Sequence, residues 1–539
     1  MLHLSRGCVA RNTLTALCVV AMGGVYQPLR AATVCVNPGG TAGCQTTIGA
    51  AVTKAAAGDT IQVAAGTYKE TVTINMSLSL IGAGSASTII EATGLPNGII
   101  VGGAASTVSG VVVSGFTVQN ANWQGILVEN ASSVIVWNNQ VLNNNKSLKV
   151  TAGATSCPGL PAVLQSGENQ DCGEGINLTG ADHSVVANNV VQNNSGGILI
   201  SDDAGATHDN LISGNLVSNN GLACGITLAS HSGMGVYHNT ISGNQSLNNG
   251  LKLPGAGAGV GIFAPGPGSQ AYGNVVINNT LTGNGLPGVT MHNHASVPGA
   301  PAVKFDDNII IGNVISGNAA DTADAATPGP TGINIFSVAP MNGTIVSQNV
   351  ISQELVGLAH NAPGQVGAFL NNFMAATGIS NLGTGTVNGT QNWWGCAAGA
   401  NSGGCALATG SGVTSTAGLT APFNSTQLPS AVAPPPPSGG GSPITITITG
   451  PAGATSATNT FATSSNQITL DASKSTSTNA GTLAFSWTPL PGFRSGAILG
   501  GNTATPTFQF STRGTYQFTL TVTDASGVTA TTTVTMQYM

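Results

Sequence analysis

The chain of 539 residues has little charge and few aromatic side chains, with 12 Lys and Arg, 18 Asp and Glu, and 4% Phe, Trp and Tyr. So few basic residues argue against binding to nucleic acid. No apolar run is long enough to cross a bilayer, so no membrane span is expected. The chain instead has 41% apolar residues, in short β-branched runs, and 76 Gly. This composition predicts a large all-β protein.

The first 31 residues have the pattern of a secretory signal peptide. Arg6 and Arg11 form a positive region, residues 14–25 are apolar, and residues 29–31 offer a cleavage site. The apolar stretch is too short for a membrane anchor. The Leu before Cys18 is a poor match to a lipidation signal. We therefore expect a secreted protein, either extracellular or on the cell surface.

Seven cysteines remain after the signal, and none has the spacing of a metal knuckle. Pairs that are close in sequence are expected to form disulfides in an exported chain. These pairs are Cys35/Cys44, Cys157/Cys172 and Cys396/Cys405. Cys224 is left over and is expected to be a buried free thiol.

From about residue 109 to residue 373, the chain repeats a Gly-x-apolar-x pattern. The repeats begin at Gly125, Gly175, Gly197, Gly225, Gly259, Gly288 and Gly332. Each repeat then reaches an Asn that precedes an apolar strand, and these residues are expected to stack as one ladder. They are Asn139, Asn189, Asn210, Asn239, Asn274, Asn308 and Asn349. Such repeats are typical of a parallel β-helix.

The start of the mature chain supports this fold class. Residues 46–84 contain an amphipathic helix at 48–57, a Gly-Asp turn, and strands at 60–63, 70–74 and 78–81. The segment resembles the N-terminal cap and first coils of the pectate-lyase-like superfamily. The resemblance implies an all-β, right-handed parallel β-helix solenoid. A cap is needed because an open end exposes apolar core and unpaired strand edges.

Four segments are expected along the chain: a signal peptide at 1–31, the β-helix domain at 32–427, a Pro/Gly linker at 428–442 and a separate module at 443–539. Trp393 and Trp394 are expected to close the end of the solenoid. The module contains LDASKST, FSW and GTYQFTLTVTDASG, and it resembles a PKD-type immunoglobulin-like β-sandwich. This resemblance implies that Trp487 lies in its core and that the module serves as a spacer or in attachment.

A β-helix brings equivalent residues of successive rungs about 4.8 Å apart, so the alignment predicts which polar side chains gather on one face. They are Asp202, Asp203, His208, Asp209, His231, His238, His292, His294, Lys304, Asp306 and Asp307. A hydrogen-bonded polar ladder is the structural alternative. Outside the group, Glu129 is expected to be solvated, and His360 is expected to be structural.

The cluster predicts an extracellular polysaccharide-active enzyme, and glycoside hydrolysis is the favoured reaction. The arrangement resembles the polygalacturonase-type hydrolases, which place carboxylates and a His on consecutive rungs. Asp182, Asp202, Asp203 and His231 occupy comparable places, with Asp209 nearby. Hydrolysis needs one carboxylic acid to protonate the leaving oxygen and a carboxylate to activate water. The Asn-Thr-Asp, Gly-His-Gly and Arg-x-Lys motifs of that family are absent.

The alternative reaction is β-elimination or C5-epimerisation of a uronate. His238 or His231 would be the base, Tyr237 the proton donor and Lys304 the group that neutralises the carboxylate. Residues 31–442 contain no Arg, which excludes an Arg-dependent pectate-lyase mechanism. A polyanion would need Ca²⁺ to bridge it to the acidic face. Further substrate contacts are expected from His208, Tyr272, His292, Asp306 and Asp307.

Two other interpretations stay open. His294 and His231, with Asp203, supply ligand types that Zn²⁺ or Cu²⁺ prefers, so a His-bound transition metal is one hypothesis. A non-catalytic carbohydrate-binding or cell-surface protein is the other, since β-helices also serve as adhesins. A monomer is expected in every case.

Overall fold

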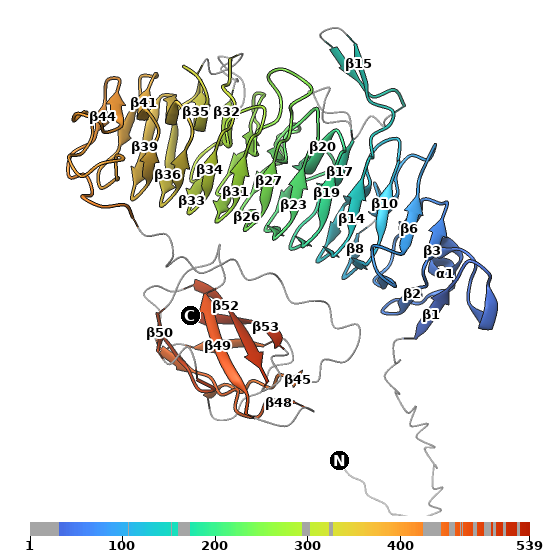
Figure 1. The fold of residues 1–539 in the computed structure, drawn as a ribbon. Coiled ribbons are helices and arrows are strands. Elements are labelled where there is room, and N and C mark those ends of the chain that lie inside the picture. Colours follow the sequence, from blue (N-terminus) through green and yellow to red (C-terminus); the bar gives the residue numbers. More distant parts are fainter. Residues whose placement is uncertain are drawn as a thin grey trace, which may run out of the picture. The chain divides into compact units, whose positions relative to one another are not determined.

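The computed structural model describes residues 32–423 and 444–538, apart from short segments at 106, 152–153, 160–172, 294–301, 323–326, 452–458, 464, 466, 478–481, 490–496, 500–502, 510–513 and 525–528. The first part is a right-handed parallel β-helix, which confirms the predicted fold class (Figure 1). The predicted signal peptide, and the linker at 428–442, lie outside the described residues. The proposed domain boundaries therefore stay predictions.

Three long parallel sheets, here named A, B and C, form the walls of the solenoid. Sheet A contains, in order, β1 (Thr33–Val36), β2 (Thr60–Val63), β5 (Ser79–Gly82), β9 (Val112–Ser114), β13 (Ile135–Trp137), β18 (Val185–Ala187), β22 (Leu211–Ser213), β26 (Thr240–Ser242), β30 (Val275–Ile277), β33 (Ile309–Ile311), β36 (Met341–Ser347), β39 (Gly364–Phe369), β42 (Thr386–Asn388) and β44 (Val413–Thr414). Sheet B contains β3 (Gly66–Tyr68), β6 (Thr88–Glu91), β10 (Thr117–Gln119), β14 (Gln140–Leu142), β19 (Val190–Gln192), β23 (Leu216–Ser218), β27 (Gln245–Leu247), β31 (Thr280–Thr282), β34 (Val314–Ser316), β37 (Val350–Ser352) and β40 (Asn372–Met374).

Sheet C contains β4 (Val72–Ile74), β7 (Ile99–Gly102), β11 (Ile126–Glu129), β17 (Glu174–Thr179), β20 (Gly196–Ser201), β24 (Ile226–Ala229), β28 (Val260–Phe263), β32 (Val289–Asn293), β35 (Thr331–Ser337), β38 (Val356–Asn361), β41 (Thr377–Asn381) and β43 (Leu407–Thr409). A fourth set of very short strands, here named sheet D, lies between C and A in the chain. It consists of β8 (Val108–Ser109) paired with β12 (Ala131–Ser132), and of β21 (Thr207–His208), β25 (Val236–Tyr237) and β29 (Ala271–Tyr272). Asp182 bridges the two groups.

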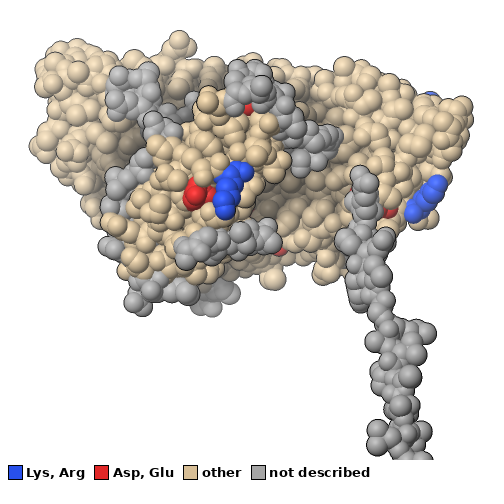
Figure 2. All heavy atoms as spheres, turned by 90° about the horizontal axis from the view of Figure 1, so that it is seen from below, with Lys and Arg blue, Asp and Glu red and all other residues tan. Residues whose placement is uncertain are grey.

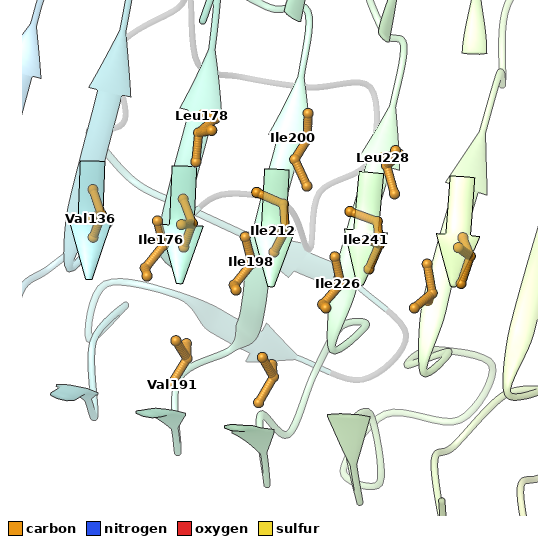
Figure 3. Close-up of a cluster of buried hydrophobic side chains, with 14 of the residues drawn as sticks. Val136, Ile176, Leu178, Val191, Ile198, Ile200, Ile212, Ile226, Leu228 and Ile241 are labelled. Carbon is orange, nitrogen blue, oxygen red and sulfur yellow. The ribbon is translucent and has the colours of Figure 1, made fainter. Parts of the chain in front are cut away.

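The predicted rung starts all lie in register in sheet C. Ile126, Ile176, Ile198 and Ile226 pair in succession, and all four side chains are buried. Figure 3 shows Ile176, Ile198 and Ile226 pointing into the core. The preceding glycines are required because neighbouring rungs touch there. A Cβ on Gly197 would lie 2.1 Å from the carbonyl oxygen of Gly225. The Gly-x-apolar-x pattern therefore reports a close backbone approach beside an inward-facing strand.

Stacked asparagines join the rungs in three ladders, where the sequence predicted one. Asn244 shows the bonding. Its Oδ1 accepts hydrogen bonds from the backbone nitrogen and the Nδ2 of Asn215, and its own Nδ2 donates to Asn279 and to the carbonyl oxygen of Ile212. This ladder contains Asn139, Asn189, Asn215, Asn244, Asn279, Asn313, Asn349, Asn371 and Asn392. Each rung is thus bonded to the next through buried amides.

The predicted single ladder merged residues of two real ones. Asn210, Asn239, Asn274 and Asn308 form their own ladder, one corner earlier in each rung. Asn139, Asn189 and Asn349 belong to the ladder of Asn244. A third ladder contains Asn144, Asn194, Asn220, Asn249, Asn284 and Asn318 and ends on Glu354. The predicted alignment of the rungs was wrong because Asn recurs every five residues within a rung. Shifting a rung by five residues therefore still places an Asn opposite an Asn of the next rung.

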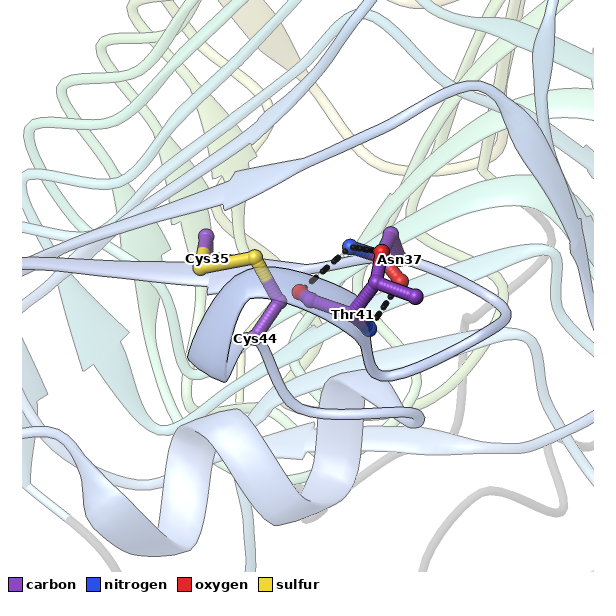
Figure 4. The surroundings of a disulfide bond; sticks show 4 residues. All are labelled: Cys35, Asn37, Thr41 and Cys44. Carbon is purple, nitrogen blue, oxygen red and sulfur yellow. Dashed lines mark hydrogen bonds between the residues drawn. A yellow bond between two sulfur atoms is a disulfide. The ribbon is translucent and has the colours of Figure 1, made fainter.

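The first coils agree with the predicted cap. Helix α1 (Ile48–Lys54) buries Ile48, and the Glu70 carboxylate accepts hydrogen bonds from the backbone nitrogens of Ile48 and Gly49. A carboxylate at this position also interacts favourably with the positive end of the helix. The Cys35–Cys44 disulfide forms beside it (Figure 4), and Cys396–Cys405 forms at the other end. Trp394 is buried there against Phe373, as expected for a closing residue.

Cys157 is disulfide-bonded, although its predicted partner, Cys172, lies outside the described residues. Cys224 is buried and is not in a disulfide, as predicted. No helix among the described residues is long and apolar enough to cross a membrane.

The C-terminal module has its own hydrophobic core. Its strands are β45 (Ile444–Thr445), β46 (Thr460–Thr463), β47 (Gln467–Thr469), β48 (Thr476–Ser477), β49 (Ala484–Pro489), β50 (Ala497–Leu499), β51 (Thr507–Gln509), β52 (Gly514–Thr523) and β53 (Thr529–Tyr538). Trp487 is buried beside Phe508, and its indole nitrogen donates to the carbonyl oxygen of Thr503. The predicted sandwich and its core Trp are therefore confirmed.

Replacement of one ladder residue tests the energetic role of the amides. Asn244→Ala leaves a buried backbone nitrogen and a buried amide of Asn215 without their acceptor, so we expect a loss of about 2 kcal/mol or more in unfolding free energy. Gln245→Ala, at the exposed neighbouring position, should change it by less than about 0.5 kcal/mol. Urea unfolding measures both, and equal effects would contradict the ladder's role.

Glu354 gives stability a pH dependence. Burial raises its pKa to about 7, although hydrogen bonds from the backbone and the side chain of Asn318 oppose the shift. The folded state therefore holds this proton more tightly than the unfolded chain, whose value is near 4.5. The stabilisation is full below pH 4.5 and is lost as the pH rises through about 7. Glu354→Gln, which stays neutral, should show a smaller fall in Tm over this range. Calorimetry at a series of pH values measures Tm for both proteins. Parallel curves of Tm against pH would refute the role given to Glu354.

Candidate functional site

Three aromatic side chains of sheet D stack on consecutive rungs. The rings of His208 and Tyr237 lie 4.7 Å apart and are inclined by 6°, and those of Tyr237 and Tyr272 lie 4.9 Å apart at 11°. The Lys304 ammonium sits over the next face of the stack, 3.2 Å from the Tyr272 ring centroid, in cation–π geometry. We name His208, Tyr237 and Tyr272 the ring column. All three are partly exposed, so their edges reach solvent.

Imidazole–carboxylate pairs flank the ring column. His208 Nδ1 lies 2.9 Å from Asp209 Oδ2, and His183 Nδ1 lies 2.6 Å from Asp182 Oδ1. His238 Nδ1 is 3.8 Å from the other oxygen of Asp209, and its ring meets Tyr237 and Tyr272 edge-on. A carboxylate on one ring nitrogen fixes the orientation of an imidazole and supports its basicity at the other nitrogen.

The backbone explains why polar residues stand beside the ring column. Asp209, His238 and Asp307 have φ of 56°, 56° and 58°, so each occupies a left-handed turn immediately before a ladder Asn. Short polar residues and His tolerate this conformation better than most side chains do. Gly273 occupies the same position in the rung of Tyr272, and a Cβ there would lie 2.6 Å from the ring of His238. The turn thus presents these side chains outward at each rung.

The hydroxyl of Tyr237 is held in its protonated form. Burial raises the pKa of Tyr237, and the nearby charges of Tyr272, Asp209 and Asp182 raise it further. A phenol of this kind is a proton donor at neutral pH and a poor base. Within the ring column, the imidazole of His208 is therefore the group that can accept a proton.

The structure gives Asp202 a structural role instead of the predicted catalytic one. Its side chain is fully buried and accepts hydrogen bonds from Ser230 Oγ and from the backbone nitrogens of His231, Ser232 and Gly235. All four donors belong to the loop that precedes β25. A carboxylate so fully bonded anchors the loop and is not available to protonate a leaving group.

Asp203 and His231 come together as predicted from rung spacing. His231 Nδ1 lies 3.0 Å from Asp203 Oδ1, and the two side chains are only 6% and 7% exposed. Asp202 holds the backbone of His231 in place. The predicted pair of adjacent aspartates is therefore split between a loop anchor and a buried His–Asp pair. This removes the geometric basis for hydrolysis by Asp202 and Asp203.

His292 is also buried, which contradicts its predicted contact with substrate. Its Nε2 lies 2.9 Å from Asp321 Oδ2, with 3% and 2% of the two side chains exposed. The rings of Phe263 and Phe336 flank it edge-on. His360 is buried and bonded to Asn381, so its predicted structural role agrees with its position.

Asp306 and Asp307 lie at the end of the ring column near Lys304. Asp306 accepts a hydrogen bond from the backbone nitrogen of Asn342, and Asp307 is exposed at its turn. His294, one predicted metal ligand, lies outside the described residues. Among the residues that the structure describes, no three His, Cys, Asp or Glu side chains are grouped to hold a metal. The metal hypothesis for His294, His231 and Asp203 stays a prediction.

The sequence predicted that Glu129 is exposed to solvent, but the structure buries it. It is only 7% exposed at the end of β11, and burial raises its pKa. It faces outward from sheet C, where the insertion after residue 146 adds the hairpin of β15 (Lys149–Thr151) and β16 (Ala154–Ser156). Asp182 pairs in register with His208 and so lies on the face around the ring column. The sequence had named it as a carboxylate on a neighbouring rung, but had left it out of the group of polar side chains expected on one face. Correct assignment of the two Asn ladders would have placed it there.

Charge elsewhere is sparse. On the face shown in Figure 2, acidic and basic atoms are few. The grouping of Asp182, His183, His208, Asp209, His238 and Lys304 on neighbouring rungs is therefore a local concentration of ionisable side chains in a nearly uncharged solenoid.

The comparisons with known proteins bear on the fold. Residues 53–250 match the family described as periplasmic copper-binding protein (NosD), and residues 456–537 match a family of PKD domains. No curated protein sequence matches the chain significantly.

Among solved structures, the alginate lyase from Paenibacillus sp. str. FPU-7 is 13% identical with a TM-score of 0.39, over 66% of this chain and 97% of that one. The Dettilon tailspike protein is 14% identical with a TM-score of 0.44, over 91% and 78%. DFA-IIIase from Arthrobacter chlorophenolicus A6, without its lid, is 13% identical with a TM-score of 0.44, over 67% and 95%. Similarity this low assigns no activity to the chain.

The three continuous parallel sheets and the two domain matches lead to one identification. This chain is a right-handed parallel β-helix protein with a C-terminal PKD-type domain.

Proposed function

We propose that this protein is exported and acts on an extended polysaccharide at the ring column. The observation that carries the proposal is the stack of imidazole and phenol rings on consecutive rungs, beside the His183–Asp182 and His208–Asp209 pairs. Rungs about 4.8 Å apart match roughly the length of one sugar unit in an extended chain, so successive units meet equivalent polar edges. Disulfides within the solenoid support export.

For the reaction, the geometry favours proton abstraction from a uronate over hydrolysis. His208, oriented by Asp209, would remove the proton next to the carboxylate, and the protonated Tyr237 would donate to the leaving glycosidic oxygen. Lys304, at the end of the stack, would neutralise the carboxylate of the sugar. Each role falls to a residue on or beside the ring column. Hydrolysis would instead need a free pair of carboxylic groups, and Asp202 and Asp203 are both engaged elsewhere.

The acidic side chains set a condition on this reaction. Asp182 and Asp209 would repel a polyanion, and a bound cation would relieve the repulsion. The NosD family description names copper, although no three His, Cys, Asp or Glu side chains among the described residues are grouped to hold a metal ion. A test of activity therefore needs arms with Ca²⁺, with Cu²⁺ and with chelator.

Product analysis tests the reaction. Mature protein on a panel of acidic and neutral polysaccharides should release products that absorb in the ultraviolet, as unsaturated uronates do. His208→Ala and Tyr237→Phe should each lower this rate by about 100-fold or more, because each removes a proton-transfer group. Lys304→Ala should lower it as well, whereas Lys252→Ala, an exposed lysine on another corner, should not.

The other outcomes are equally informative. New reducing ends without absorbance would replace elimination by hydrolysis. No turnover, with glycan binding that His208→Ala weakens, would make the protein a binding module. No binding to any glycan would reject the proposal.

The roles given to two aspartates predict opposite defects. Asp202→Ala leaves four donors of the 230–235 loop, two of them fully buried, without their acceptor, so we expect a loss of about 3 kcal/mol or more in unfolding free energy. Asp209→Asn keeps a residue that tolerates the left-handed turn, and it should change stability by less than about 1 kcal/mol while lowering kcat. Urea unfolding and kinetics on the same samples compare the two. A stable, inactive Asp202→Ala protein would restore the catalytic role of Asp202.

A further inference from the structure

A pocket lies on the outer side of sheet B, in the first rungs of the solenoid. Its volume is about 640 Å³, and it is lined by Thr67, Lys69, Glu91, Thr93, Leu95 and Asn120. This volume falls within the range of about 300–1,000 Å³ that is usual for small-molecule sites. The lining residues stand on or shortly after β3, β6 and β10, whose residues Tyr68, Ile90 and Val118 point into the core. We name it the sheet B pocket.

The sheet B pocket and the ring column belong to different sheets and different rungs. In the rung of His208, the chain passes from sheet D through β22 of sheet A to β23 of sheet B. Along sheet B, β6 lies four strands before β23, which is about 19 Å at the usual strand spacing. One sugar unit cannot reach both places. The sheet B pocket is therefore a site separate from the ring column.

Hydrogen bonds fix the Glu91 carboxylate in the wall of the sheet B pocket. Its Oε2 accepts from Gln119 Nε2 at 2.7 Å, and its two oxygens accept from Asn120 Nδ2 at 3.0 and 3.1 Å. The backbone nitrogen and the hydroxyl of Thr93 both donate to Oε1. Burial opposes the ionisation of Glu91, but these bonds outweigh it and hold its pKa below the usual value. The donors fill the roughly four lone-pair positions of a carboxylate, so Glu91 orients its neighbours.

The carboxylate decides which hydrogen-bonding groups remain for a ligand. Thr93 gives its hydroxyl proton to Glu91, and Asn120 gives its amide, so Thr93 Oγ1 and Asn120 Oδ1 are left as acceptors. Lys69 contributes an ammonium group, which can only donate. In the part of the chain that the structure describes, Lys69 forms no ion pair. The sheet B pocket thus combines fixed acceptors with a cationic donor.

We propose that the sheet B pocket binds one sugar unit through a pair of neighbouring hydroxyls. A hydroxyl donates and accepts at once, so each can donate to Thr93 Oγ1 or Asn120 Oδ1 while the pair accepts from the Lys69 ammonium. Leu95 offers an apolar surface to the C–H face of the sugar ring. The charges of Lys69 and Glu91 offset each other, so the sugar needs no charge of its own. A polysaccharide as the source of the sugar rests on the proposed function, whereas recognition of the hydroxyl pair rests on the pocket alone.

The sheet B pocket would hold the protein on a polysaccharide while the ring column engages another segment of it. Two linked sites raise the apparent affinity for a polymer above the affinity of either site for a fragment. Lys69→Met should therefore weaken binding to the polymer, and it should leave the turnover of short oligosaccharides unchanged. Equal binding of the polymer by both proteins would contradict this anchoring role.

Ligand-observed NMR titration of the mature full-length chain measures binding to the pocket. The probes are short neutral oligosaccharides and short uronate oligosaccharides. Lys69→Met and Thr93→Val nearly keep the side-chain shape at exposed positions, so both variants should fold. Each should weaken binding about ten-fold, as the loss of one hydrogen bond predicts. Lys54→Met, at the exposed end of α1, is the matched control and should bind as the wild type does.

His208→Ala separates the sheet B pocket from the ring column. Binding that survives His208→Ala and is weakened by Lys69→Met supports the pocket. Binding that His208→Ala abolishes and Lys69→Met leaves intact would overturn the pocket and leave the ring column standing. Binding of uronates alone, weakened by Lys69→Met but not by Thr93→Val, would put a carboxylate in place of the hydroxyl pair and overturn the proposal as well. So would a wild-type protein that binds neither kind of sugar.

Discussion

Stacked amides fix the position of every rung on the next, and the other features of the solenoid follow from that registration. Each ladder Asn uses its oxygen to accept from the rung before and its nitrogen to reach the rung after. Such buried bonds tolerate neither a slip nor a change of rung height, because either would leave amides unpaired. Equivalent side chains are therefore held about 4.8 Å apart, whatever their chemistry. The stacked rings of His208, Tyr237 and Tyr272 are one consequence.

The sequence was sufficient to predict the strands that form the walls of the solenoid. It was insufficient to assign the Asn residues at its corners. Gly175 and Gly197 located sheet C correctly because a glycine at close backbone approach leaves a local signature. The Asn residues were harder to assign, since Asn210, Asn215 and Asn220 stand five residues apart in one rung and belong to three different ladders. Their separation follows from the very short strands of sheet D, which add a corner that no apolar period marks. The wrong alignment also left Asp182 out of the group of polar side chains that was expected on one face, although Asp182 pairs in register with His208.

Burial of the ionisable side chains could not be read from spacing, because it depends on loops that fold back from other rungs. Asp202 and Asp203 are adjacent, yet one anchors the loop at 230–235 and the other holds His231. His292 looked like a surface ligand, but it pairs with Asp321, which arrives from the following loop. His208 and Tyr237 stayed at the surface because the turn after them is tight. The sequence thus predicts which rungs carry the site, and loop packing decides which side chains act in it.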